Sequence, residues 1–233
     1  MSERSTRQQY LLIGRDESWM QFNRRVLEEA QDASNPLLER VKFLAITASN
    51  LDEFVEIRVA GLLQRIEDGY TEAGPEGLTP QQTLDSITEI MHSFMTEQYG
   101  CWNKQLLPAL HQVGVRVLPW DDIDETARES ATAFYQREVD PLLTPITIDP
   151  AHPFPRVLNK ALCIALLLRR KRKGTPGPVL GVVTVPRALP RLVPLPSTEG
   201  THDFIFLHDL IDLQPNCVAL TTVMQLRAHC FQQ

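Results

Sequence analysis

Along the first 114 residues, apolar positions recur at the three- and four-residue spacing of amphipathic helices. Each of four such stretches begins at a residue type that favours a helix start, because its side chain can accept a hydrogen bond from an unpaired amide. The four predicted starts are Ser18, Asn35, Asn50 and Thr79. A connection containing glycine and proline at 70–78 precedes the last helix, which is expected to end at Gly114. Four amphipathic helices with short connections predict an antiparallel helical bundle.

Beyond Gly114 the spacing changes and predicts a second domain of mixed structure. The predicted elements are a strand at 115–118, a helix at 121–137, a proline-rich irregular stretch at 141–155, strands at 161–169 and 179–185, and a strand at 204–207. The two middle strands flank a Gly/Pro-rich connection, which is typical of a β-hairpin with a long loop. The sequence therefore predicts an α+β chain, with a helical bundle at 1–114 followed by an α+β domain with a small antiparallel sheet.

Composition narrows the class of protein. Hydrophobic residues make up 43% of the chain and charged residues 22%, which are ordinary values for a chain with a packed core. The longest apolar run, 161–168, is too short to span a bilayer, and the first fifteen residues do not resemble a signal peptide. We therefore expect the four cysteines to be reduced thiols. They form no CxxC pair and the histidines show no ligand spacing, so no metal site is expected.

The net charge of -6 conceals an uneven distribution of charge. Residues 151–200 contain nine Lys or Arg side chains and one acid, Glu199. The densest part is 169–173, in the predicted hairpin loop. A basic segment in an acidic protein can bind a polyanion, and it can equally be a solvated loop that keeps the protein soluble.

Several segments resemble the type 1 (long-chain) polyphosphate kinases. The resemblance rests on ESWMQFNRRVL at 17–27, NPLLERVKFLAI at 35–46, SNLDEF at 49–54 followed by IRVAGL at 57–62, and VPRALPRL at 185–192 with 204–211. These segments agree with the family in order, spacing and residue identity over 18–211. The resemblance implies an N-terminal helical domain at 1–114 and an incomplete head domain at 115–211, followed by an unmatched tail at 212–233.

The resemblance also implies an activity. The family's enzymes transfer the terminal phosphate of ATP reversibly to polyphosphate through a phosphohistidine, a covalent strategy that divides one displacement into two. The catalytic histidine belongs to two C-terminal phospholipase-D-like domains, and nothing in this chain resembles them. The implied partners are ATP with Mg²⁺, polyphosphate, the missing catalytic domains and a second copy bound through the head domain, without nucleic acid. The implied location is the cytoplasm, with peripheral association with a membrane as an additional option.

Two residues are candidates for contacts with phosphate. The resemblance implies that Asn50 binds ATP, whereas its residue type alone favours a helix cap, and Asp52 and Glu53 would partly repel an anion there. Arg58 lies at helical spacing from Phe54 and is expected on the buried face, in an ion pair with Asp52, Glu53 or an acid of another helix. The alternative is that Arg58 reaches a phosphate. No catalytic residue is expected within the chain.

Two other classes of function remain open from the sequence. The chain could be a module without catalytic activity that dimerises or binds polyphosphate, or it could be the product of a truncated gene. A DNA sequence encoding the catalytic domains immediately downstream would argue against the stand-alone module.

Overall fold

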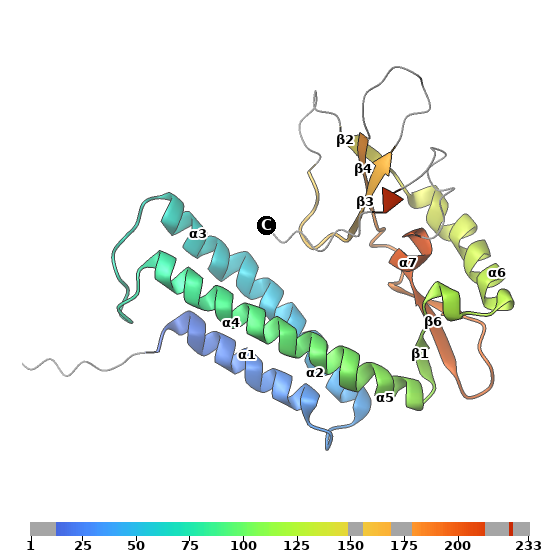
Figure 1. Ribbon diagram of the computed structural model, residues 1–233, viewed down its shortest axis with the longest axis horizontal. Helices are drawn as coiled ribbons and strands as arrows, with labels where there is room; N and C mark the ends of the chain where they lie inside the picture. Colours follow the sequence, from blue (N-terminus) through green and yellow to red (C-terminus); the bar gives the residue numbers. More distant parts are fainter. Residues whose placement is uncertain (1–12, 149–155, 169–178, 213–223, 226–233) are drawn as a thin grey trace, which may run out of the picture. The chain divides into compact units, whose positions relative to one another are not determined.

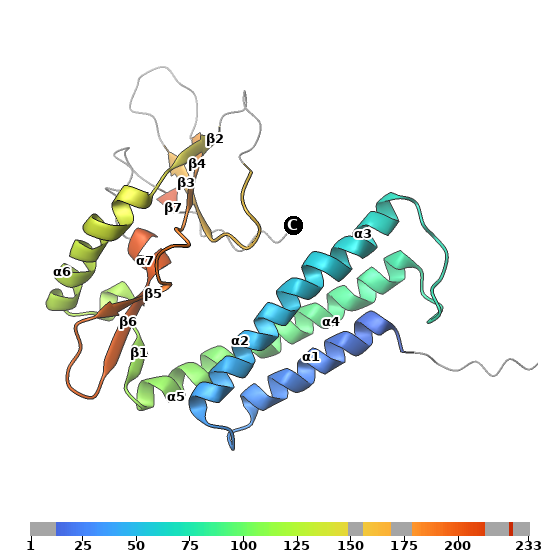
Figure 2. The same ribbon diagram turned by 180° about the vertical axis from the view of Figure 1, so that it is seen from behind.

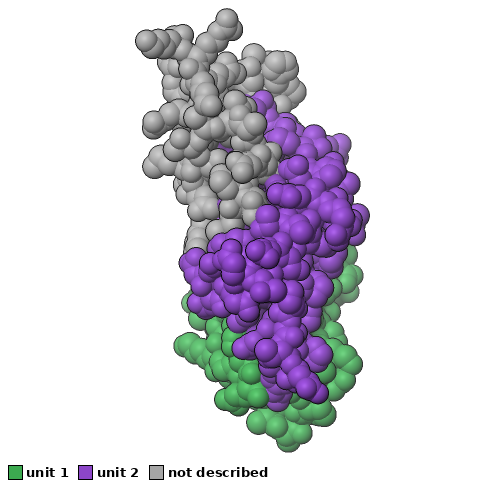
Figure 3. All heavy atoms as spheres, turned by 90° about the vertical axis from the view of Figure 1, so that its right-hand side faces the viewer, with its two compact units in different colours: residues 1–112 green, residues 113–233 purple. Residues whose placement is uncertain are grey.

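The computed structural model describes residues 13–148, 156–168, 179–212 and 224–225 (Figure 1). The chain divides into two compact units, Met1–Gln112 and Val113–Gln233, coloured separately in Figure 3.

Unit 1 is built from antiparallel helical rods, three of them within residues 13–112 (Figures 1 and 2). The rods are α1 (Arg15–Gln31), then α2 (Leu37–Phe54) continuing through η1 (Val55–Val59) into α3 (Ala60–Glu67), and α4 (Pro80–Cys101) continuing through η2 (Trp102–Leu106) into α5 (Leu107–Gln112). Helix α1 packs against α2 and α4, and α3 packs against α4. The apolar faces enclose one core, whose largest fully buried side chains are Phe94, Met20, Leu27, Ile87 and Leu106.

The prediction of four helices was wrong because no helix begins at Asn50. This residue lies inside α2, which runs without interruption from Leu37 to Phe54. The stretch contains neither glycine nor proline to end the helix, and its buried positions continue past Asn50 at helical spacing. Those positions are Arg40, Leu44, Thr47, Leu51 and Phe54. Residue types that favour a cap also occur within helices, so Asn50 does not mark a boundary.

Of the other three predicted helix starts, one is confirmed and two were wrong. At Thr79 the capping box is confirmed, since the hydroxyl accepts from the Gln82 amide and the Gln82 side chain accepts from the Thr79 amide. The predicted start at Ser18 was wrong because α1 begins at Arg15. The predicted cap at Asn35 was also wrong, since Pro36 occupies the cap position of α2.

A π-helical turn changes which residues of the second rod are buried. Through η1 the buried positions run from Phe54 to Val59, a spacing of five, and then to Leu62. The wider turn brings Val59 to the core, where it is 8% exposed, in place of Arg58. Arg58, predicted on the buried face, is instead half-exposed.

One half of unit 2 is a mixed sheet with strand order β1-β6-β5. Strand β1 (Val115–Val117) pairs in parallel with β6 (His202–Phe206), and β5 (Leu192–Leu195) pairs antiparallel with β6. The core of this part combines strand residues with α6 (Glu125–Phe134), η4 (Tyr135–Val139) and α7 (Leu207–Asp212). Short 3-10 turns lie at Trp120–Asp122 and Asp140–Leu142. The predicted helix at 121–137 is confirmed with a later start, at the Asp124 cap.

Glycine is required where β1 approaches the turn before β6. Gly114 has φ +82°, and a Cβ there would lie 2.6 Å from the carbonyl oxygen of Gly200. Its own carbonyl accepts from the His202 amide at 2.7 Å. A side chain at this position would therefore separate the two segments.

The other half of unit 2 is an antiparallel sheet of order β2-β4-β3-β7. Its strands are β2 (Ile146–Ile148), β3 (Cys163–Leu168), β4 (Val179–Thr184) and β7 (Met224–Gln225). The antiparallel β3–β4 pairing confirms the predicted hairpin. Strand β2 falls in the stretch predicted as irregular, and β5 was not predicted. The basic segment 169–173 lies outside the described residues, as does the predicted tail apart from Asp212 and β7.

Candidate functional site

Asn50 lies on the second rod of unit 1 with its side chain partly exposed. Its amide nitrogen Nδ2 donates a hydrogen bond to Oδ1 of Asn23 on α1, at 3.0 Å. Because a primary amide carries two hydrogens, this bond leaves a second N–H available to a ligand. Asn50 is thus a side chain held at one end by the protein and accessible to solvent.

The position of Asn50 changes the chemistry that it can offer. The unpaired amides of a helix N-terminus bind phosphate, but Asn50 is inside a continuous helix, where the backbone amides are already hydrogen-bonded. Any contact with a nucleotide at this point is therefore made by the side chain.

A buried polar network supports Asn50 and joins all three rods. Asn23 and Thr47 are both 0% exposed. The Asn23 amide donates to the carbonyl oxygen of Thr47 at 3.1 Å, and the Gln98 amide of α4 donates to the Thr47 hydroxyl at 2.8 Å. That hydroxyl donates to the Leu44 carbonyl at 2.6 Å. Buried polar groups without partners are costly, and these are paired.

Two exposed isoleucines and an exposed acid lie near Asn50 along the second rod. Ile46, one turn before Asn50, is 46% exposed, and Ile57, two turns after it, is 61% exposed. Glu53, three positions after Asn50, is also exposed. A pocket of unit 1 lies elsewhere, between α1 and α4, and is lined by Glu17, Met20, Gln21, Arg24 and Ile90.

Arg58 pairs with an acid of another helix, one of the predicted options. Its Nε lies 3.9 Å from Oδ1 of Asp16 on α1, and the Arg58 side chain is 38% exposed. The predicted partners Asp52 and Glu53 are not its ion-pair partners among the described residues. The long distance and the exposure make this pair a weak contribution to stability.

Arg40 forms a buried brace that sequence reasoning missed. Its Nε donates to the carbonyl oxygen of Ala30 at 2.8 Å, near the end of α1, and its Nη2 donates to Gln105 at 3.1 Å. A cation at a helix C-terminus donates hydrogen bonds to unpaired carbonyls and interacts favourably with the negative end of the helix dipole. The Cys101 thiol contacts the same Ala30 carbonyl at 3.8 Å, and burial raises the pKa of Cys101 although the nearby Arg40 opposes this effect.

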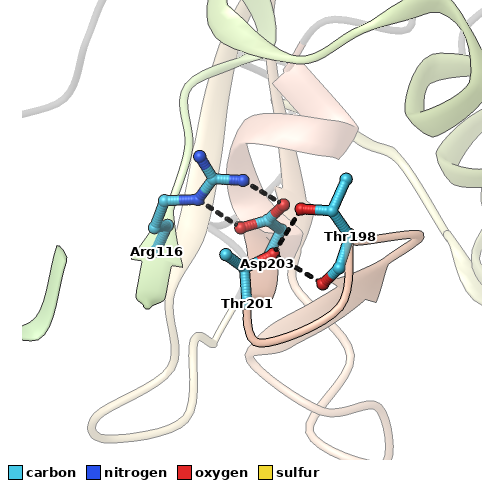
Figure 4. Close-up of polar contacts among 4 residues, drawn as sticks. All are labelled: Arg116, Thr198, Thr201 and Asp203. Atoms are coloured by element: carbon cyan, nitrogen blue, oxygen red, sulfur yellow. Dashed lines mark hydrogen bonds and ion pairs between the residues drawn. The ribbon is translucent and has the colours of Figure 1, made fainter. Parts of the chain in front are cut away.

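In unit 2, an ion pair joins the parallel strands β1 and β6 (Figure 4). Nε and Nη2 of Arg116 each lie 2.6 Å from a carboxylate oxygen of Asp203. These hydrogen bonds raise the pKa of Arg116. The turn before β6 is closed by Thr198 and Thr201, whose hydroxyls lie 3.2 Å apart. Since Asp203 is 7% exposed and its pairing is bidentate, the arrangement is a structural brace.

The part of the chain that the structure describes contains neither a metal-binding cluster nor a membrane-spanning helix. No group of three or more His, Cys, Asp or Glu side chains there is arranged to hold a metal ion. Among the same residues, no helix has the length and apolar character needed to cross a membrane.

Sequence reasoning could have identified the supporting network. Met20, Asn23, Leu27 and Ala30 recur at helical spacing, and all of them are buried. An asparagine within an otherwise apolar stripe indicates a polar group that needs partners inside the core. Thr47 gives the same signal in α2.

Comparison with known proteins gives a consistent assignment. The family model described as "Polyphosphate kinase N-terminal domain" matches residues 12–118, and the one described as "Polyphosphate kinase middle domain" matches residues 126–218. The chain is 44% identical to the polyphosphate kinase of Bacillus cereus over 202 residues, which are 84% of this chain and 28% of that protein. It is 40% identical to the polyphosphate kinase of Mycobacterium ulcerans over 206 residues, again 28% of that protein.

A solved structure agrees with these sequence matches. The crystal structure of polyphosphate kinase from Porphyromonas gingivalis superimposes with a TM-score of 0.79 at 28% identity, over 93% of this chain and 32% of that one. The chain thus spans less than a third of the length of the relatives that it matches. Matches to two successive domains, in the same order and over most of the chain, place this protein in the type 1 polyphosphate kinase family, of which it carries the N-terminal and middle domains.

Proposed function

We propose that this chain acts as the N-terminal part of an ATP:polyphosphate phosphotransferase and that Asn50 contributes a contact to ATP. Membership of the polyphosphate kinase family supports the first statement. The observation that supports the second is the geometry of Asn50, whose amide is fixed by Asn23 on one side and partly exposed on the other.

The catalytic chemistry belongs to parts of the polypeptide outside this chain. In the proposed reaction a histidine takes the terminal phosphate of ATP and passes it to polyphosphate, so the bond to phosphorus is broken and formed twice. Since the matched relatives are more than three times as long as the matched segment, they have room for the domains that carry this histidine. Association of two copies through the middle domain is part of the same proposal.

The role proposed for Asn50 is to donate its second amide hydrogen to bound ATP. Exposed Glu53 lies on the same side of the helix and would repel an uncompensated phosphate. The proposal therefore takes ATP as its Mg²⁺ complex, in which the metal offsets much of the phosphate charge.

Replacing Asn50 by aspartate tests this role. The experiment uses a full-length chimera in which residues 13–211 of this chain replace the matched segment of the Bacillus cereus enzyme. Asn50→Asp removes the donor and adds a negative charge, and a lost hydrogen bond to a charged group costs roughly 1.5–3 kcal/mol. We expect kcat/KM for ATP to fall about tenfold or more.

The matched control is Asn103→Asp, which makes the same change of charge at an exposed position of η2. It should leave the ATP kinetics unchanged. Asn50→Asp also loses the bond to Asn23, so its melting temperature is expected to fall somewhat, and kinetics are compared at a temperature where both variants are folded. Equal ATP kinetics in Asn50→Asp, Asn103→Asp and the parent would remove Asn50 from the nucleotide site.

A further inference from the structure

We propose that Asn23 is a positioning residue for ATP recognition, acting by fixing the direction of the Asn50 side-chain amide. This inference rests on the proposed function of Asn50. It assigns a role to a fully buried residue on a different helix, α1, which does not itself reach solvent.

The hydrogen bonds of Asn23 allow one orientation of its amide. Its Oδ1 accepts from Asn50 at 3.0 Å, and its Nδ2 donates to the carbonyl oxygen of Thr47 at 3.1 Å. Exchanging the oxygen and nitrogen would place a donor against the Asn50 amide and an acceptor against a carbonyl, so both bonds would be lost. The Thr47 carbonyl can only accept, so it directs the Asn23 oxygen toward Asn50, and the amide end of Asn50 turns toward that oxygen.

Fixing one hydrogen of the Asn50 amide also fixes the other. The amide group is planar, so once one N–H points at Asn23 the second N–H has a set direction. Without Asn23, the partly exposed side chain could adopt other rotamers, and a ligand would have to select among them at an entropic cost. The bond to Asn23 prepares the donor before ATP arrives.

The support extends to the third rod. Gln98 of α4 donates to the Thr47 hydroxyl at 2.8 Å, and Thr47 supplies the carbonyl that holds Asn23. Each of the three rods therefore contributes to the direction of one amide. A leucine at position 23, with the same branched shape, would avoid the burial of polar atoms, so the asparagine is not the residue that the hydrophobic effect alone would favour.

Two substitutions of Asn23 separate positioning from stability. Asn23→Leu removes the acceptor for Asn50 but places an apolar side chain in an apolar core. Asn23→Asp keeps an oxygen acceptor for Asn50 but puts a carboxyl group in the core, against the Thr47 carbonyl. We expect Asn23→Asp to be the less stable variant and Asn23→Leu to have the larger increase in KM for ATP, about fivefold in the full-length chimera. A KM increase that follows the loss of stability instead would overturn the inference.

A double-mutant cycle shows whether Asn23 acts through Asn50. In the Asn50→Ala background, Asn23→Leu should cause no further increase in KM for ATP, while its effect on melting temperature persists. If Asn50→Ala alone leaves KM unchanged, the proposed function of Asn50 fails. If Asn50→Ala raises KM but Asn23→Leu does not, only the positioning role of Asn23 fails.

A measurement on the 233-residue chain needs no enzyme activity. The side-chain amide of Asn50 is followed by NMR, through its two hydrogen resonances and its χ1 couplings. We expect a single rotamer with one slowly exchanging hydrogen in the parent and in Asn23→Asp, and rotamer averaging in Asn23→Leu. Averaging in the parent chain, or a fixed rotamer in Asn23→Leu, contradicts the inference.

Discussion

Arg116 and Asp203 lie directly opposite each other in the parallel β1–β6 ladder, and their side chains meet through two hydrogen bonds of 2.6 Å. The Asp203 side chain is nearly buried, whereas the Arg116 side chain is 38% exposed. Water can therefore solvate the arginine if its partner is removed, but it cannot solvate the aspartate equally well.

This asymmetry predicts unequal effects of breaking the pair. Arg116→Ala leaves a buried carboxylate unpaired and should lower the melting temperature by several degrees, and Asp203→Asn should lower it less. The exposed pair of Arg137 and Glu138 provides the control, since Arg137→Ala should have almost no effect. Thermal unfolding of the three variants gives the order. Because the hydrogen bonds to Asp203 raise the pKa of Arg116, the arginine stays charged through neutral pH and its contribution should be constant there.

The π-helical turn η1 predicts that Val59 contributes more to stability than Arg58. Val59→Ala removes buried methyl groups and should cost about 2 kcal/mol of unfolding free energy. Arg58→Ala should cost at most about 1 kcal/mol, because the Arg58–Asp16 pair is long and partly exposed. Urea unfolding of both variants is the measurement. A larger loss of stability in Arg58→Ala than in Val59→Ala would contradict the π-helical turn and support uninterrupted α-helical spacing.

Burial of Cys101 predicts low thiol reactivity and a pH-dependent loss of stability. Cys101 is 1% exposed and its pKa lies above the ordinary 9.0, mainly because of burial. Above pH 9.0 the unfolded chain therefore loses this proton while the folded chain keeps it, and the free energy of unfolding falls. Cys101→Ala should weaken that fall.

Peptide mapping after alkylation should show Cys163, which is half-exposed, reacting before Cys101.

This chain covers less than a third of the length of its relatives, and we predict that it is inactive on its own. We expect the purified chain to form no polyphosphate from ATP and Mg²⁺, because the proposed phosphohistidine lies outside it. The assay measures polyphosphate against a preparation from a host strain that lacks its own polyphosphate kinase. Synthesis above that background would place a catalytic group within these 233 residues.

The helices of unit 1 could be predicted from their apolar spacing, but their joints could not. Asn50 was interpreted as a helix start because its residue type suits a cap, while the stripe that continues through α2 includes the polar Thr47. A count of apolar positions overlooks a buried threonine. The five-residue step from Phe54 to Val59 is likewise invisible to a search at helical period. In unit 2, the parallel pairing of β1 and β6 depends on residues far apart in the chain, which local patterns do not encode.

For the site, residue type alone favoured Asn50 as a cap, and the family resemblance supplied the interpretation as an ATP contact. The structure places Asn50 inside α2 rather than at a helix start and anchors its side chain to Asn23, and its contact with ATP stays a proposal. The basic segment 169–173 lies outside the described residues, so its affinity for a polyanion stays a prediction.

The pairing of β1 with β6 also sets an order of events during synthesis. Unit 1 ends at Gln112, so its three rods can close as soon as that part of the chain has left the ribosome. Strand β1 follows at once, but its partner is supplied only when His202–Phe206 emerges. Closure over so long an interval is slow, because the entropy of the intervening chain is lost before the contacts form. The nascent protein therefore passes through a stage in which the helical bundle is folded and strand β1, which follows it, is still unpaired.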